Sequence, residues 1–307
     1  MARKLKHWFT TMVLAVGSAC TPMGKTPPAP TSQARDGHER WAVYYDKQLP
    51  ASTFAAYQLV VFDRIYHPDF QELKGKTTVL SYISMGEVHG DTFEQQLLAE
   101  QKALMGTRTK WNSYTVDITS KTWEHMLDEQ IEDALAKGFD GIMLDTLDSA
   151  LHLADMDSPE RGEKAQEAAV KLIQRMREKH PRMKIMLNRG FDVLPRVASN
   201  IDYVLGESML AETDISTGQS KVFPPHTYQT TAGHLLSARA IAPNIKLYTL
   251  DYWNQDDVQG MQTLYAIHRA RGFIPYVTTP DLRRHTPEPK TSVHQANRPS
   301  SVEDRDA

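Results

Sequence analysis

Eight short apolar runs alternate with longer amphipathic segments through the middle of the chain. The runs lie at 41–45, 59–62, 78–84, 141–144, 184–187, 203–205, 246–250 and 273–277. In Ile142–Leu144 the apolar residues follow one another without alternation, which is typical of a strand covered on both faces in a parallel sheet. Strands that alternate with helices favour a parallel sheet, and eight units over about 240 residues predict a single-domain (β/α)8 TIM barrel of the α/β class.

Two of the intervening segments carry helix boundary signals. Thr119 or Ser120 can cap the helix before the fourth run, and Gly138 can end that helix in the left-handed conformation. Ser158 and Pro159 provide a cap and a first-turn proline for a later helix. We therefore expect long helices on both sides of the fourth strand.

One further apolar run, at 113–118, does not fit a count of eight. We assign it to an elaborated loop after the third strand. The alternative architecture is an open, doubly wound parallel sheet. Neither Gly-x-Gly-x-x-Gly nor Gly-x-x-x-x-Gly-Lys follows any predicted strand, so the barrel is favoured.

The N-terminus has the pattern of an export signal. A basic start, a short apolar core at 8–16 and small residues at 17–19 predict a signal peptide over residues 1–19. Cys20, the only cysteine, follows directly and makes the segment resemble a bacterial lipoprotein signal, although Gly17 stands where that pattern prefers Leu. We expect Cys20 to be lipidated and the protein to be exported and lipid-anchored at the cell envelope, in the periplasm or at the outer membrane.

The regions that flank the barrel are rich in Pro, Ser, Thr and charged residues. This composition predicts a lipoprotein-type tether over 20–40 and a disordered tail over 283–307, on either side of a barrel domain over 41–282.

The overall charge excludes one class of partner. The chain has a formal net charge of −3 and no Lys/Arg cluster, so a nucleic-acid partner is not expected. Loss of residues 1–19 would remove three basic residues and no acidic one, which brings the charge to −6.

Acidic residues stand at the ends of six of the eight runs. They are Asp46, Asp63, Glu87, Asp145, Glu207 and Asp251, and the fifth run ends on Asn188 and Arg189. In a barrel the carboxyl ends of the strands converge on one mouth. Each acid taken alone could simply cap a loop or pair with an arginine. Six like charges at one rim would cost stability, and this favours a functional site.

Glycoside hydrolysis is the chemistry that such a rim suits best, because it needs two carboxyls that flank the glycosidic bond. Aromatic residues that could stack on sugar rings stand near the strand ends, namely Tyr45, Tyr66, Tyr82, Tyr252 and Trp253. A metal-dependent hydrolase is a weaker alternative, since His89, His152 and His226 form no ligand-spaced set. We expect no metal and no cofactor. Ser84 and Ser208 lack the Gly-x-Ser-x-Gly motif of serine hydrolases.

Several motifs together resemble a known family. They are Gly138-Phe-Asp-Gly, Leu144-Asp-Thr-Leu-Asp148, Asn188-Arg-Gly-Phe191, Gly206-Glu-Ser208 and Gly272-Phe-Ile-Pro-Tyr-Val277. They look like the barrel hydrolase domains of PelA polysaccharide proteins and, more distantly, the endo-α-1,4-polygalactosaminidases, over Trp41 to Leu282. The resemblance implies a (β/α)8 barrel that cleaves α-1,4-linked galactosamine or N-acetylgalactosamine polymers without a metal.

The resemblance also implies roles for residues. Asp145 matches the family's acid after the fourth strand and Glu207 the acid after the sixth, and by analogy we expect Asp145 to be the nucleophile and Glu207 the general acid/base of a retaining enzyme. The predicted substrate-binding residues are Tyr45, Asp63, Tyr82, Glu87, Asp148, Asn188, Arg189, Asp251, Tyr252 and Trp253. The expected partner is an amino-sugar polysaccharide, whose cationic form the acidic rim would attract. A non-catalytic glycan-binding barrel is the rival interpretation, and it would not need both acids.

Overall fold

The computed structural model describes residues 37–106, 109 and 111–290. Chain contacts separate Met1–Arg35 from Asp36–Ala307, and all described residues belong to the second part. The predicted signal peptide, Cys20, most of the predicted tether and residues 291–307 lie outside the described residues.

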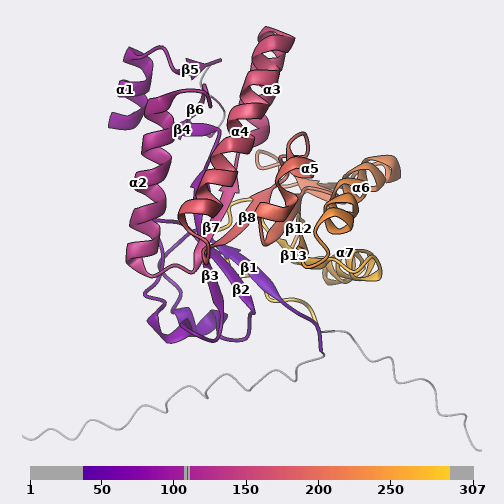
Figure 1. The fold of residues 1–307 in the computed structure, drawn as a ribbon. Coiled ribbons are helices and arrows are strands. Elements are labelled where there is room, and N and C mark those ends of the chain that lie inside the picture. Colours follow the sequence, from indigo (N-terminus) through magenta and orange to yellow (C-terminus); the bar gives the residue numbers. More distant parts are fainter. Residues whose placement is uncertain (1–36, 107–108, 110, 291–307) are drawn as a thin grey trace, which may run out of the picture. The chain divides into compact units, whose positions relative to one another are not determined.

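Eight parallel strands form one sheet (Figure 1). In their order in the sheet they are β1 (Trp41–Tyr44), β2 (Leu59–Phe62), β3 (Thr78–Ser84), β7 (Gly141–Asp145), β8 (Lys184–Asn188), β9 (Tyr203–Glu207), β12 (Lys246–Tyr252) and β13 (Ile274–Thr278). Each of the eight predicted runs is one of these strands, so the predicted (β/α)8 barrel is confirmed.

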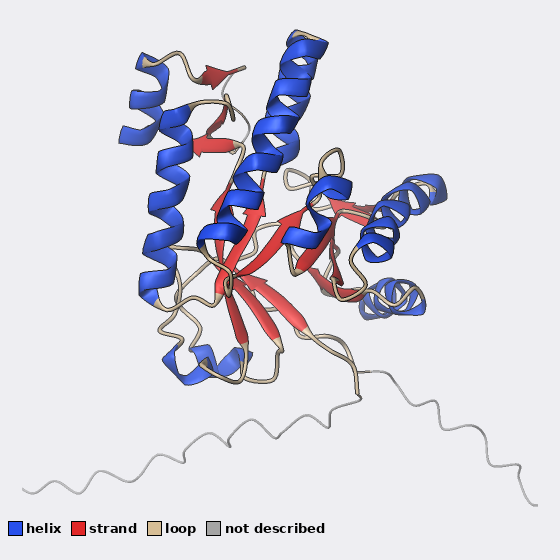
Figure 2. Ribbon diagram, viewed as in Figure 1, coloured by secondary structure: helices blue, strands red, loops and turns tan. Residues whose placement is uncertain are grey.

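Helices cover the outside of the sheet (Figure 2). They are η1 (Ala51–Phe54), η2 (Gln71–Leu73), α1 (Phe93–Glu100), α2 (Lys121–Lys137), α3 (Leu147–Asp157), α4 (Pro159–Lys179), α5 (Leu194–Val197), η3 (Ala198–Asn200), α6 (Pro225–Ile241) and α7 (Val258–Ala270). The predicted boundaries are confirmed: Ser120 caps α2 by accepting from the Trp123 amide, Gly138 ends it at φ 94°, and Ser158 caps α4.

Alternation along the strands sorts their side chains into two layers. Met143 and Met186 point into the barrel, where they join an aromatic-rich cluster that includes Trp41. Ile142 and Leu144 belong to the other cluster, between the sheet and the helices. Because side chains in a strand alternate between faces, the residue two positions after Met143 or Met186 also points inward.

The C-terminal segment folds over the seam of the barrel. In the described part of the chain, β1 and β13 end the hydrogen-bonded order and share no ladder. Leu282 accepts a hydrogen bond from the Tyr45 amide at 2.7 Å, and buried Thr286 lies 2.9 Å from the Thr278 hydroxyl (Oγ1 to Oγ1). Glu288 forms an ion pair with Arg269. Residues 283–290, predicted as the start of a disordered tail, are therefore part of the fold, and the rest of that predicted tail lies outside the described residues.

The last residues of the predicted tether, 20–40, also contact the barrel. Glu39 forms an ion pair with Lys246 at 2.8 Å and accepts from the Tyr248 hydroxyl at 2.7 Å. Both partners are on β12, so the barrel's own contacts begin before residue 41.

Two insertions follow strands at the mouth. After β3, the strands β4 (Glu87–His89), β5 (Leu104–Met105) and β6 (Ser113–Val116) form a small antiparallel sheet in the order β4-β6-β5. The extra run at 113–118 thus lies in the loop after the third strand, as predicted. After β9, β10 (Ala211–Thr213) and β11 (Ser220–Val222) form a hairpin.

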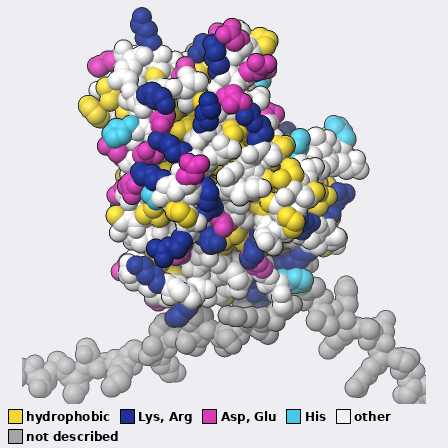
Figure 3. Space-filling view, viewed as in Figure 1, with side chains coloured by type: hydrophobic (Ala, Val, Ile, Leu, Met, Phe, Trp, Pro, Cys, Tyr) yellow, Lys and Arg dark blue, Asp and Glu magenta, His cyan; other side chains and the backbone are white. Residues whose placement is uncertain are grey.

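Charges of both signs are mixed on the surface. On the face shown in Figure 3, Lys and Arg side chains lie among Asp and Glu. Oppositely charged side chains one helical turn apart also form ion pairs, such as Lys164 with Glu160 at 2.7 Å. This mixture agrees with the lack of a Lys/Arg cluster in the sequence. Among the described residues, no helix has the length and apolar character needed to cross a membrane.

Candidate active site

Three polar residues end three neighbouring strands and point into the barrel. Asp145 ends β7, Asn188 ends β8 and Glu207 ends β9, each two residues after an inward-facing apolar residue. Asn188 is 4% exposed, and its Nδ2 donates to Asp145 Oδ1 at 2.7 Å and to Glu207 Oε2 at 2.6 Å. Those two carboxylate oxygens are therefore at most 5.3 Å apart, the two bonds laid end to end. One amide group holds the two predicted catalytic acids together.

A tyrosine hydroxyl supports each carboxylate. Tyr252, at the end of β12, donates to Glu207 Oε1 at 2.5 Å, and the Tyr82 hydroxyl hydrogen-bonds to Asp145. The Tyr45 ring meets the Tyr82 ring edge-on, with 5.2 Å between centroids. Burial raises the pKa of all three hydroxyls well above the usual value for tyrosine. They are therefore protonated donors at neutral pH.

The environment moves the pKa of both acids upward. Burial raises the pKa of Asp145, while hydrogen bonds from Asn188, the Thr146 backbone and Tyr82 oppose the rise. Burial also raises the pKa of Glu207, and the neighbouring charge of Asp145 raises it further. Two carboxyls this close cannot easily both ionise, so the pair tends to hold one proton. Such a pair can supply a carboxylate and a proton donor at once.

The backbone turns sharply immediately after each of these three residues. Thr146, Arg189 and Ser208 have φ values of 63°, 55° and 50°, a left-handed conformation that non-glycine residues rarely adopt. Each costs on the order of 1–3 kcal/mol and persists where the surroundings hold it. The Thr146 hydroxyl does so in part, since it lies 2.8 Å from Ser84 Oγ and accepts from the Gly86 amide at 3.0 Å. The sequence does not reveal these left-handed residues, because no glycine or asparagine marks the three positions.

Other predicted residues also gather at the mouth. Besides burial, the negative charge of Glu87 raises the pKa of both Asp145 and Tyr82. The Glu87 Oε2 accepts a hydrogen bond from Ser113 Oγ at 2.5 Å. Asp148 forms an ion pair with Arg189 at 2.8 Å. The predicted residues that the structure brings to the mouth are Tyr45, Asp63, Tyr82, Glu87, Asp148, Asn188, Arg189 and Tyr252.

The structure does not bring two of the predicted residues, Asp251 and Trp253, to the inner lining of the mouth. Asp251 is fully buried on the opposite face of β12, where Oδ1 accepts from the Leu210 and Ala211 amides and Oδ2 lies 2.5 Å from His268 Nε2. Trp253 packs against the outer core and donates to Asp257 at 2.9 Å. Both lie an odd number of residues from Tyr252, and alternation therefore turns them away from the barrel interior.

Asp46, the acid after β1, has a local role. Its Oδ1 accepts from the Lys47 amide at 2.6 Å, as the loop-cap alternative predicts.

Asp251 is expected to be a stability residue. Asp251→Ala should lower the free energy of unfolding by about 3–5 kcal/mol, because it removes one partner of a buried pair and leaves two backbone amides without an acceptor. Urea denaturation measures this loss. Lys164→Ala, which breaks only a surface ion pair, serves as the control and should leave the denaturation midpoint unchanged. An Asp251→Ala variant as stable as the control would contradict the assignment.

Comparisons with known proteins identify a family and a fold. The sequence model of a family described as glycoside-hydrolase family GH114 matches residues 23–298. The glycoside hydrolase domain of PelA from Pseudomonas aeruginosa is 26% identical with a TM-score of 0.69, and the match covers 80% of this chain and 96% of that domain. A variant of that domain with one glutamate replaced by alanine matches equally well.

A more distant match shows the fold alone. Ega3 from Aspergillus fumigatus, solved in complex with galactosamine, is 16% identical with a TM-score of 0.59, over 84% of this chain and 97% of that one. A search of curated proteins found no match.

Proposed function

The chain belongs to glycoside-hydrolase family GH114, and from this premise we propose that it hydrolyses α-1,4-linked galactosamine and N-acetylgalactosamine polysaccharide with Asp145 and Glu207 as its catalytic carboxyls. The observation that carries the proposal is the Asn188 amide, which joins the two carboxylates at 2.7 and 2.6 Å. Two carboxyls on facing sides of a glycosidic bond are what this reaction needs. The substrate class rests on the likeness to the PelA domain and on the acids at the mouth.

The roles follow from the surroundings of each acid. Asp145 receives three hydrogen bonds that favour its charged form, which suits the nucleophile. Glu207 stands beside that negative charge, which favours its protonated form and suits the general acid. Asp145 attacks the anomeric carbon while Glu207 gives its proton to the departing glycosidic oxygen. Glu207 then takes a proton from the water that hydrolyses the glycosyl–Asp145 ester.

This double displacement retains the anomeric configuration. Retaining glycosidases have carboxyls about 5–5.5 Å apart, and inverting ones about 6.5–9.5 Å. The limit of 5.3 Å between the oxygens bound to Asn188 supports retention.

The charge of the mouth supports an amino-sugar substrate. Arg189 pairs with Asp148, and Asp251 lies on the other face of its strand. The charges of Glu87 and Asp63 remain at the mouth, Glu87 near Asp145 and Asp63 near the Tyr45 hydroxyl. A site with one sign of charge raises the local concentration of ligands of opposite sign. A galactosamine unit with a free amine is cationic at neutral pH, whereas a uronic-acid unit is anionic.

Cleavage of defined polymers tests the proposal. The mature protein should shorten partly deacetylated α-1,4-galactosamine polymer, seen by mass spectrometry, and should leave α-1,4-polygalacturonate intact. NMR at early times should show the α-anomer as the first product. The rival metal-dependent hydrolase predicts loss of activity with a chelator, whereas we expect full activity. Failure to shorten any galactosamine polymer contradicts the proposed substrate, and an initial β-anomer contradicts retention.

We also propose that Cys20 carries a lipid anchor, on the strength of its place directly after the export signal. Cys20→Ala should move the protein from the membrane fraction to the soluble fraction, because stable anchoring requires acyl chains. Thr21→Ala, one residue further on, is the matched control and should stay with the membranes. An unchanged distribution of Cys20→Ala, or a mature N-terminus without acyl groups by mass spectrometry, would exclude the anchor.

A further inference from the structure

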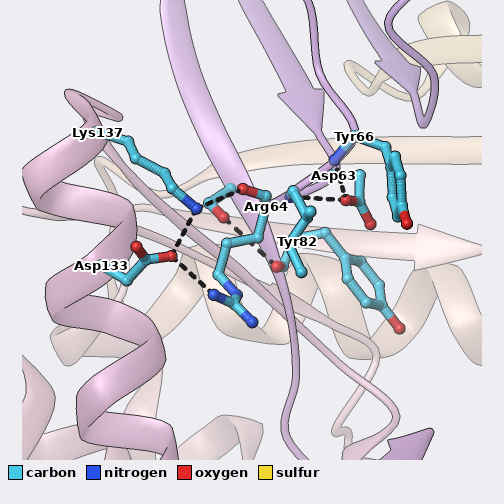
Figure 4. A network of polar contacts seen from close by, with 8 residues as sticks. Asp63, Arg64, Tyr66, Tyr82, Asp133 and Lys137 are labelled. Carbon is cyan, nitrogen blue, oxygen red and sulfur yellow. Dashed lines mark hydrogen bonds and ion pairs between the residues drawn. The ribbon is translucent and has the colours of Figure 1, made fainter. Parts of the chain in front are cut away.

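The turn after β2, residues 63–66, lies at the same end of the barrel as the two catalytic carboxyls, because all eight strands are parallel. Burial raises the pKa of the Tyr45 hydroxyl, and the negative charges of Asp145, Glu207 and Asp63 raise it further. Asp63 is therefore close enough to this hydroxyl to interact with it. In Figure 4 the side chains of Asp63, Tyr66 and Tyr82 lie on one side of this turn, and Arg64 points the other way, toward α2. Asp63 and Tyr66 therefore face the mouth together.

Hydrogen bonds on the mouth side hold the turn in one conformation. Asp63 Oδ1 accepts from the Ile65 amide at 2.7 Å and from the Tyr66 amide at 2.6 Å. A carboxylate that accepts from amides two and three residues ahead stabilises a tight turn. The place of the Tyr66 ring is thus tied to the carboxylate of Asp63.

Ion pairs hold the same turn from behind. Arg64 Nη1 bonds to Asp133 on α2 at 2.7 Å (Figure 4). Lys137, one helical turn further along, bonds to Asp133 at 2.7 Å and to the Arg64 carbonyl at 3.2 Å. Tyr66 is therefore presented by a turn that is already ordered, which lowers the entropy cost of binding to it.

The turn presents two unused binding groups. Tyr66 is 60% exposed although it is a large aromatic residue. Both amides of the turn bond to Asp63 Oδ1. Within the described part of the chain, Asp63 Oδ2 has no hydrogen bond or ion pair and is available to a ligand. An aromatic face binds the C–H side of a sugar ring and attracts a cation, and a carboxylate binds an ammonium group.

We propose that Asp63 and Tyr66 form a subsite for one amino-sugar unit of the polymer and select a unit with a free 2-ammonium group. The Tyr66 ring stacks on the sugar, and Asp63 Oδ2 accepts from the ammonium group. The inference rests on the proposed function, because it assumes a galactosamine polymer as the ligand. It adds which residues distinguish a free amine from an N-acetyl group.

Four variants separate the ring, the charge and the turn. Tyr66→Ala removes the ring, and Tyr66→Phe keeps it. Asp63→Asn keeps an Oδ1 acceptor for the two amides but removes the negative charge. Ile65→Ala is the matched control, because Ile65 has the same 60% exposure in the same turn.

kcat/KM is measured for each variant on partly deacetylated and on fully acetylated polymer. Tyr66→Ala should lower it roughly 5- to 20-fold on both polymers, mainly through KM, while Tyr66→Phe and Ile65→Ala stay within about twofold of the wild type. Asp63→Asn should lower it about 10-fold on partly deacetylated polymer and leave it unchanged on fully acetylated polymer.

The outcomes distinguish this subsite from the function on which it rests. If the wild type cleaves neither polymer, the proposed function and the ligand of the subsite are both overturned. If the wild type cleaves them and Tyr66→Ala is as active as Ile65→Ala, the stacking role is wrong. If Asp63→Asn lowers kcat/KM by the same factor on both polymers, Asp63 acts by holding the turn and does not bind the ammonium group.

Discussion

Glu207→Gln and Asp145→Asn are each expected to lower kcat on galactosamine polymer by about 10³- to 10⁵-fold. The amide introduced by Glu207→Gln would have no acidic proton for the glycosidic oxygen, and the amide introduced by Asp145→Asn would be a poor nucleophile, so neither step could proceed in the same way. Both replacements keep the size and much of the hydrogen bonding of the native side chain. Steady-state cleavage kinetics measure the loss, and thermal denaturation should show a folded protein in each case.

A strand-end acid outside the pair provides the control for this result. Asp46→Asn changes a carboxylate that accepts from the neighbouring Lys47 amide, and its activity should stay within about twofold of the wild type. If Glu207→Gln or Asp145→Asn were as active as Asp46→Asn, that residue would have no place in the chemical step. The site would then fit the non-catalytic glycan-binding barrel.

Asn188→Ala is expected to lower kcat/KM by about 10²- to 10³-fold, the usual effect of losing one well-placed hydrogen-bond donor in an active site. Asn188 touches both carboxylates, so its loss removes a bond from each and lets the two groups separate. The same change should also alter the pH dependence of the reaction.

The direction of the pH effect follows from the hydrogen bonds. The Asn188 amide favours the ionised form of both acids and so lowers the pKa of Asp145 and of Glu207. Without it both pKa values rise. The acid limb of the kcat/KM profile reports ionisation of the nucleophile and the basic limb reports loss of the acid's proton, and therefore both limbs should move to higher pH.

A pH profile separates this role from simple loss of structure. Asn254→Ala, in the loop after β12, is the control and should keep the wild-type profile; its side chain accepts only from the Asp256 amide in the described structure. A reduced rate for Asn188→Ala with both limbs unmoved would mean that Asn188 does not tune the pair. If both limbs of the Asn188→Ala profile moved to lower pH, the native Asn188 would be stabilising the protonated carboxyls, contrary to the inferred role of its amide as a donor to ionised carboxylates.

The strands and helices of this protein could be read from local sequence. Apolar runs such as Ile142–Leu144 indicate buried strands because a strand covered on both faces buries consecutive apolar residues and these runs are too short for helices. Ser120, Gly138 and Ser158 marked helix ends correctly because capping depends on a few neighbouring residues. Such signals act over one turn of chain, so the sequence alone suffices for them.

The end of the barrel at which the proposed catalytic pair lies could also be predicted from sequence, since Asp145 and Glu207 directly follow predicted strands. The direction in which each strand-end residue points was not. Tyr252 contacts Glu207, whereas Asp251, one residue earlier, is buried against His268 on the other face. A shift of one residue reverses the face of a strand, and the boundary of an apolar run is not known to one residue from sequence.

Contacts between distant segments were decided by the tertiary structure alone. Asn188 was expected to hold sugar, and the sequence did not indicate that it also joins Asp145 and Glu207, which lie 43 and 19 residues away in the chain. The segment after Leu282 looked disordered from its composition, yet Thr286 contacts β13 and Glu288 forms an ion pair with Arg269 on α7. Barrel closure brings these partners together, and no local pattern encodes it, because the register that aligns them is set by the packing of all eight strands.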